Sequence, residues 1–140
     1  MANITNNFTH DFNDGNGLVP ACRHVNPNGS KGGWVADTAK VEATVYVWPD
    51  AAVFGNAQVS GDAQVSGSAQ VSGDARVSGN VRVYGSAQVY GHVLVSENAL
   101  IFGSAQVYGH AQVSGDALVF ENAQVSNRNL ILFGCLAGYN

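Results

Sequence analysis

Two histidines and an aspartate in this 140-residue chain have the side-chain types of a metal or acid–base site. Asp74, His92 and His110 are spaced 18 residues apart, and each occupies the same place in a repeated hexad. Imidazole and carboxylate groups bind Zn²⁺ or exchange protons near neutral pH. What they can do depends on whether the fold brings them to one point or leaves them in a row.

The elements that position these residues are defined by a period of six. An aliphatic residue stands at every sixth position from Val35 to Val125, and Ile131 extends the series. The residue four places after each is nearly always Ala or Val, with Asn129 as the polar exception. A short fixed period is typical of a solenoid, in which each coil stacks on the next.

Each hexad combines a short strand with a corner. Small and aliphatic residues alternate with polar or aromatic ones, which is the period-two pattern of a strand with one buried face. The corner is Gly-Asp, Gly-Asn, Gly-Ser or Gly-His in most hexads, with Pro49-Asp50 and Glu97-Asn98 among the exceptions. We expect a type II-like turn whose second corner residue is left-handed.

If each hexad forms one side of a coil, three hexads complete a triangular coil of 18 residues, and sixteen hexads give about five coils. The pattern of aliphatic, small, two variable, small and variable residues resembles the hexapeptide-repeat family. The near-identical copies Val-Ser-Gly-Asp-Ala-Gln and Val-Tyr-Gly-Ser-Ala-Gln are most similar to its non-enzymatic bacterial and prophage members. The resemblance implies an all-β, single-stranded left-handed parallel β-helix that assembles around a three-fold axis.

The chain divides into three regions. Residues 1–33 have no period and are rich in Asn, so we expect a polar N-terminal arm or cap that can bind a protein partner. Residues 34–136 form the β-helix and residues 137–140 a C-terminal tail.

Composition excludes several partners. The formal charge is −4 and 11% of the residues are charged, so no basic stripe supports nucleic-acid or anionic-membrane binding. No run is long enough for a membrane helix, and the first residues lack the features of a signal peptide. We expect a cytoplasmic protein, or a virion-associated one if a phage encodes it.

The three faces of the prism differ in polarity. Residues 18 apart in the sequence stack on the same face of the prism. The most apolar of the three faces, called the third face, carries Leu100, Phe102, Leu118 and Phe120 on adjacent coils. Ladders of this kind stabilise any sheet, but a contiguous exposed apolar patch usually marks a contact surface. We therefore expect a homotrimer. Its predicted interface comprises Trp48, Tyr84, Leu100, Phe102, Leu118 and Phe120.

The same stacking places Asp74, His92 and His110 in a row along one corner, with the outer two roughly 10 Å apart. Three donors in a line cannot converge on an ion held at about 2 Å. We expect no cofactor and no metal within one chain. The three residues are candidates only for a site that a neighbouring subunit completes, as the resemblance to hexapeptide carbonic anhydrases implies.

The unbroken repeat favours a non-catalytic β-solenoid that serves as a structural, scaffold or binding module, of a kind that a phage or prophage can encode. An alternative is a coenzyme A-dependent acyltransferase, the commonest activity that the resemblance implies, with His92 or His110 as the base. A second alternative is small-anion binding in clefts between subunits. Its cations would be Arg76, Arg82 or Arg128.

Overall fold

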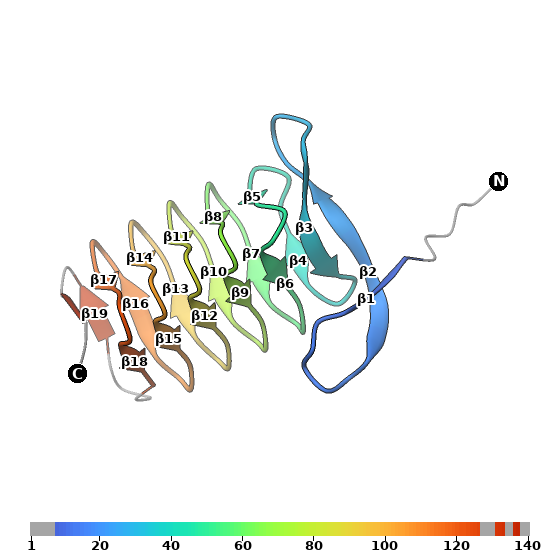
Figure 1. Cartoon of the computed structure of the whole chain (residues 1–140). Coiled ribbons are helices and arrows are strands. Elements are labelled where there is room, and N and C mark those ends of the chain that lie inside the picture. Colours follow the sequence, from blue (N-terminus) through green and yellow to red (C-terminus); the bar gives the residue numbers. More distant parts are fainter. Residues whose placement is uncertain (1–7, 127–130, 134–135, 138–140) are drawn as a thin grey trace.

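The structure is a computed structural model that describes residues 8–126, 131–133 and 136–137. Strands and no helices occur in these ranges, and the strands form three sheets that run along the molecule (Figure 1). The first sheet has the order β1(Thr9–Asp11), β2(Leu18–Val25), β3(Lys31–Ala36), β6(Ala52–Val53), β9(Gln70–Val71), β12(Gln88–Val89), β15(Gln106–Val107) and β18(Gln124–Val125).

The other two sheets contain only parallel strands. The second sheet has the order β4(Lys40–Val41), β7(Gln58–Val59), β10(Arg76–Val77), β13(Leu94–Val95), β16(Gln112–Ser114) and β19(Ile131–Phe133). The third sheet has the order β5(Tyr46–Val47), β8(Gln64–Val65), β11(Arg82–Val83), β14(Leu100–Ile101), β17(Leu118–Val119) and β20(Leu136–Ala137).

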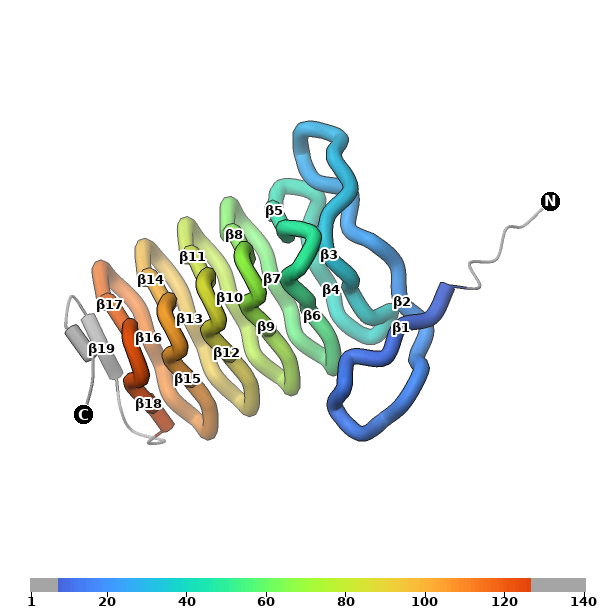
Figure 2. Tube along the Cα trace, viewed as in Figure 1, coloured from blue at the N-terminus to red at the C-terminus, as the bar shows by residue number. Residues whose placement is uncertain are grey.

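The predicted parallel β-solenoid of about five coils is confirmed. Each coil contributes one strand to each sheet, and Val83 pairs with Val65 and with Ile101, 18 residues away on either side. The chain descends the near side and ascends the fainter far side as it advances from the N-terminus, so the helix is left-handed (Figure 2).

The core is a column of small and branched side chains. The inward Val, Ile and Ala residues of the central coils are almost completely buried, as the alternation predicts. Val35 and Val41, at the N-terminal end of the column, are only partly buried. The interior is therefore closed on three sides by the sheets, and its N-terminal end is closed less completely.

The corner geometry differs from the expected turn. In the turn closed by the 3.2 Å hydrogen bond from Ala69 N to Ser66 O, the left-handed residue is Gly67, with φ of 62°, and not Ser68. Positive φ at the first central position alone is the mark of a type II′ turn. Glu97 and Glu121 also adopt positive φ, of 65° and 56°. The prediction of a left-handed second residue was wrong, because coil stacking imposes the geometry on the first.

The reason lies in how closely corners stack. A Cβ added to Gly67 would lie 2.8 Å from the carbonyl oxygen of Gly85 in the next coil. Glycine is therefore favoured twice, by its φ and by the space available. The Pro49 corner keeps negative φ, as the proline ring requires, and is closed by a 2.9 Å bond from Ala51 N to Trp48 O.

The register changes near the C-terminal end. Val113 pairs with Leu132, so the expected pairing of Val113 with Ile131 is wrong by one residue. In the expected register Asn129 would face the apolar core, where an amide without a partner costs about 1–3 kcal/mol. Val119 still pairs with Ala137, 18 residues on.

Residues 9–25 add two antiparallel strands to the first sheet. β1 pairs with β2, and β2 pairs with β3 with a bulge between Arg23 and Val25. These strands lie across the N-terminal end of the solenoid (Figure 1). The loop after β1 inserts Phe12 against Phe54 on the outer surface, with ring centroids 4.7 Å apart. No helix long and apolar enough to cross a membrane occurs in the described ranges.

Candidate functional site

The third sheet presents the apolar face that the sequence predicts as an interface. Strands β14 and β17 place Leu100 directly beside Leu118, because the two are paired in the ladder. Both leucines are half-buried, as are Phe102 and Phe120 two residues further on. The face is therefore continuous but less exposed than the sequence alone indicates.

The aromatic rings of this face shield one another. Tyr84 and Phe102 stack with centroids 5.0 Å apart and planes at 4°, and Phe102 and Phe120 stack at 5.5 Å and 12°. Such stacking stabilises the sheet and leaves the ring edges for contacts. Trp48, the remaining predicted interface residue, is 38% exposed and belongs to a separate pair with Tyr46. Ser66 stands between Trp48 and Tyr84 in the ladder, so Trp48 is not continuous with the patch.

Asp74, His92 and His110 form a row along one corner. The Asp74 carboxylate lies 3.5 Å from Nδ1 of His92, and the two side chains are 50% and 60% exposed. The His92 and His110 rings stack at 5.0 Å. In the described part of the chain, no group of three or more His, Cys, Asp or Glu side chains is placed to hold a metal ion.

An open groove runs beside this row. It has a volume of about 500 Å³ and is lined by Asn56, Gln58, Asp74, Arg76, His92 and Leu94. Asn56 donates a 3.4 Å hydrogen bond to Asp74, which keeps the carboxylate turned toward the corner. Of the arginines considered for anion binding, Arg76 lies in this groove, Arg82 is exposed on the third face and Arg128 is outside the described residues. The groove contains an Asp–His pair and one cation, which are the elements of an acid–base or anion site.

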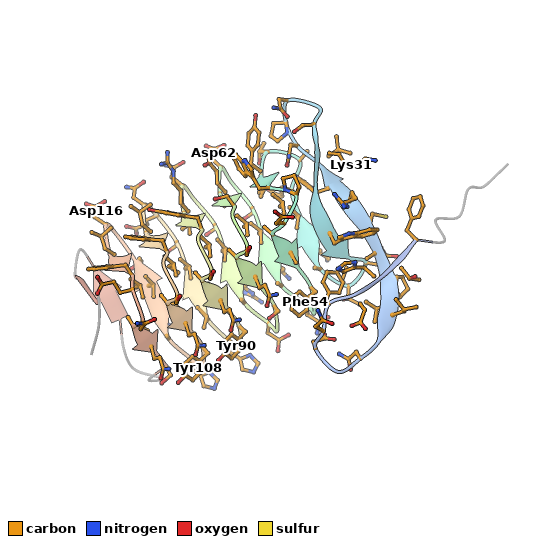
Figure 3. The ribbon with its side chains drawn as sticks, in the orientation of Figure 1. Lys31, Phe54, Asp62, Tyr90, Tyr108 and Asp116 are labelled. Atoms are coloured by element: carbon orange, nitrogen blue, oxygen red, sulfur yellow. The ribbon has the colours of Figure 1, made fainter. Side chains whose placement is uncertain are left out.

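The first sheet carries a second aromatic ladder. Tyr90 and Tyr108 stack with centroids 5.2 Å apart, and both are visible on the same side of the solenoid (Figure 3). Burial, and then the nearby Tyr108 phenol, raise the pKa of Tyr90. Gln88 and Gln106 stand beside them in register, so this face is more polar than the third.

Sequence reasoning missed a cleft formed by the N-terminal strands. About 300 Å³ of space lies between the β1–β2 loop and the Pro49-Asp50 corner, next to Trp34 and Gln70. His10 stacks on Trp34 at 4.7 Å, and the Arg23 guanidinium lies 5.1 Å from the same ring. Nothing in the sequence of residues 8–17 indicated which face of the solenoid they cover.

Comparison with known families bears on the repeat itself. The family model described as YdcK Beta solenoid repeat matches residues 57–73, 69–85, 75–91, 87–103 and 111–127. Every match begins at an inward Ala, and the starts differ by multiples of six, which is the hexad period. The chain is a β-solenoid repeat protein. No curated protein and no solved structure matches it.

The matches confirm the resemblance to hexapeptide-repeat β-helices for the β-solenoid between residues 57 and 127. They do not extend to the N-terminal strands. They describe an architecture, so the absence of catalysis stays a prediction.

Proposed function

We propose that this β-solenoid is a non-catalytic module that acts as a structural scaffold or binding surface and assembles as a homotrimer. The observation that supports the proposal is the apolar ladder on the third sheet, in which Leu100, Phe102, Leu118 and Phe120 lie on neighbouring coils. A contiguous apolar patch on the surface of a small protein usually marks a contact surface. A closed three-fold assembly leaves no copy of the face uncovered.

The uniformity of the coils supports a structural role. The described coils follow one another at 18 residues from β4 to β18, with no loop inserted between them. Active sites generally need side chains from irregular segments held at one point. A regular prism instead offers long flat ladders, which suit contact with other macromolecules. We place this module in the cytoplasm, or in a virion if a phage encodes it.

The trimer is tested by removing the apolar complementarity of one face. In Phe102→Glu/Phe120→Glu, six like charges would meet around the three-fold axis, so we expect the trimer to dissociate. The matched control is Tyr90→Glu/Tyr108→Glu, which makes the same kind of change on adjacent coils of the first sheet. Size-exclusion chromatography with light scattering should show dissociation for the first variant only. If both variants, or neither, change the assembly, the third face is not the interface.

A coenzyme A-dependent acyltransferase is the second candidate, because Asp74 can orient His92 as a base beside the 500 Å³ groove. Acetyl coenzyme A turnover would be assayed with a panel of amino sugars and amines. Turnover that His92→Ala abolishes, and that Gln112→Ala on the same side preserves, would replace the structural proposal by a catalytic one.

A further inference from the structure

At the N-terminal end of the solenoid, side chains bond to backbone groups that in the other coils bond to the preceding coil. In each coil alternate residues donate their N–H groups to the next coil, as Tyr46 does to Ala63 O at 3.2 Å and Trp48 does to Val65 O at 2.8 Å. Successive residues of a strand point their N–H and C=O groups to opposite neighbours. Val45 and Val47 therefore present a carbonyl and an N–H toward a preceding coil, and among the described residues the third sheet has no strand before β5.

Two side chains take the place of that strand, His24 near the end of β2 and Asn26 in the turn between β2 and β3. His24 Nε2 lies 2.6 Å from Val45 O and, because a carbonyl only accepts, this nitrogen carries the proton. Asn26 Oδ1 accepts a 2.9 Å hydrogen bond from Val47 N. His24 and Asn26 are the buried polar side chains of the described residues, at 9% and 6% exposure. His24 and Asn26 thus supply one donor and one acceptor where the preceding strand of a parallel ladder would supply them.

The turn that carries Asn26 is held in place by hydrogen bonds. Asn26 accepts from Gly29 N at 2.8 Å through its backbone carbonyl, and its own N–H donates to Ser30 O at 2.9 Å. Its side-chain amide donates to Ser30 Oγ at 3.1 Å. A Cβ on Gly32 would overlap the Val47 carbonyl oxygen, so the hairpin backbone lies directly against the first coil. No space remains there for a strand from another molecule.

The opposite end offers a strand that fits the same edge. β20 is the last strand of the third sheet, and Leu136 occupies the ladder position of Tyr46, Gln64, Arg82, Leu100 and Leu118. Suppose that a second copy stacks its N-terminal end on β20, in the register of the third sheet. A Leu136 N–H that points away from β17 would then meet the Val45 carbonyl oxygen of that copy. A strand at the edge of a sheet can pair with a strand of another chain.

We propose that His24 and Asn26 close the N-terminal end of the solenoid and exclude β20 of a second copy, so that copies cannot grow head to tail. The excluded partner is chemically defined, since it is the C-terminal coil of this same chain. This axial contact is separate from the lateral contact through the third face, so either can fail alone.

The test uses the full chain with His24→Glu and Asn26→Lys, which remove the donor and the acceptor without adding apolar surface. We expect faster amide exchange at Val47 and a sedimenting mass that rises with concentration above that of the parent. The matched control carries the same changes at exposed corners, His110→Glu with Asn80→Lys, and should sediment like the parent. His24→Gln, which keeps an N–H donor, should also sediment like the parent.

A second-site change separates ordered growth from non-specific aggregation. Leu136→Pro removes the N–H that would bond to Val45 O, and proline is tolerated on an edge strand. Added to the His24→Glu/Asn26→Lys chain, it should restore the parent's mass. Association that persists in this triple variant would overturn the proposal. Three results for the double variant would also overturn the proposal. These are an unchanged amide-exchange rate at Val47, release of the β2–β3 hairpin without association of the chains, and loss of the parent's β-sheet circular dichroism.

Discussion

Replacing Val83 by Asp tests which positions of each hexad face the core and which face the solvent. Val83 lies on β11 in the middle of the solenoid, is 0% exposed and pairs with Val65 and Ile101 in the adjacent coils. No polar partner faces it, because its neighbours in the column are Val, Ile and Ala. A carboxyl group introduced there would be forced to stay protonated.

The expected loss of stability follows from two terms. Keeping a carboxyl neutral at pH 7, about 3 pH units above its usual pKa of about 3.9, costs about 4 kcal/mol at 1.36 kcal/mol per unit. Losing a fully buried valine side chain costs about 2 kcal/mol more. The sum of about 6 kcal/mol is comparable with the whole stability of many small domains, which is about 5–15 kcal/mol.

Urea denaturation measures the loss of stability for Val83→Asp and for Ser78→Asp. The side chain of Ser78, directly after β10, is exposed. We expect less than about 0.5 kcal/mol for the surface change. Because burial raises the pKa of the introduced carboxyl, the loss at position 83 should shrink as the pH falls from 7 toward 4. A loss below about 1 kcal/mol, or equal losses for the two variants, would refute the assignment.

Four further outcomes follow from the corners and the aromatic contacts. Glu97→Gly should stabilise the protein by about 0.5–1 kcal/mol in thermal denaturation, because glycine removes the left-handed strain at φ of 65°. Gly85→Ala should instead destabilise by about 2 kcal/mol or more, since its Cβ would lie 2.9 Å from a backbone nitrogen; stabilisation by alanine would contradict the stacking argument. Ultraviolet titration should show Tyr90 ionising above the usual pKa of about 10, and Tyr108→Phe should lower the pKa of Tyr90. The stability that neutral Tyr90 contributes is present below about pH 10 and is lost as the pH rises through its raised pKa. A Tyr90 pKa at the usual value would contradict its burial. Phe12→Ala should speed amide exchange at Ala21, which donates to Phe8 O at 3.1 Å, and leave the central coils unchanged; equal effects on both would mean that the N-terminal strands and the coils unfold together.

The central coils could be predicted from sequence because each inward position repeats the same requirement. Val83 and its equivalents need a branched apolar side chain and 18-residue pairing, so the pattern determines the register of every coil from β4 to β18. The corner type could not be read in the same way. Asn98 tolerates left-handed φ better than Glu97, yet close stacking on the next coil places the positive φ at Glu97.

The ends depended on contacts that have no period. Phe54 lies on the outer surface, where Phe12 covers it, and its exposure is only 7%. His24 and Asn26 are single polar residues in an aperiodic segment, and only the structure shows that they face Val45 and Val47. The third-face patch was visible in sequence, whereas its partial burial through stacking of Phe102 on Tyr84 was not.

The molar mass of the native protein in solution tests the proposed assembly most directly. Sedimentation equilibrium gives this mass independently of shape, which matters for an elongated prism. We expect three times the chain mass of 14.6 kDa, constant over a wide range of concentration because His24 and Asn26 prevent axial growth. A mass equal to one chain at all concentrations would contradict the trimer and leave the apolar third face without the partner proposed for it.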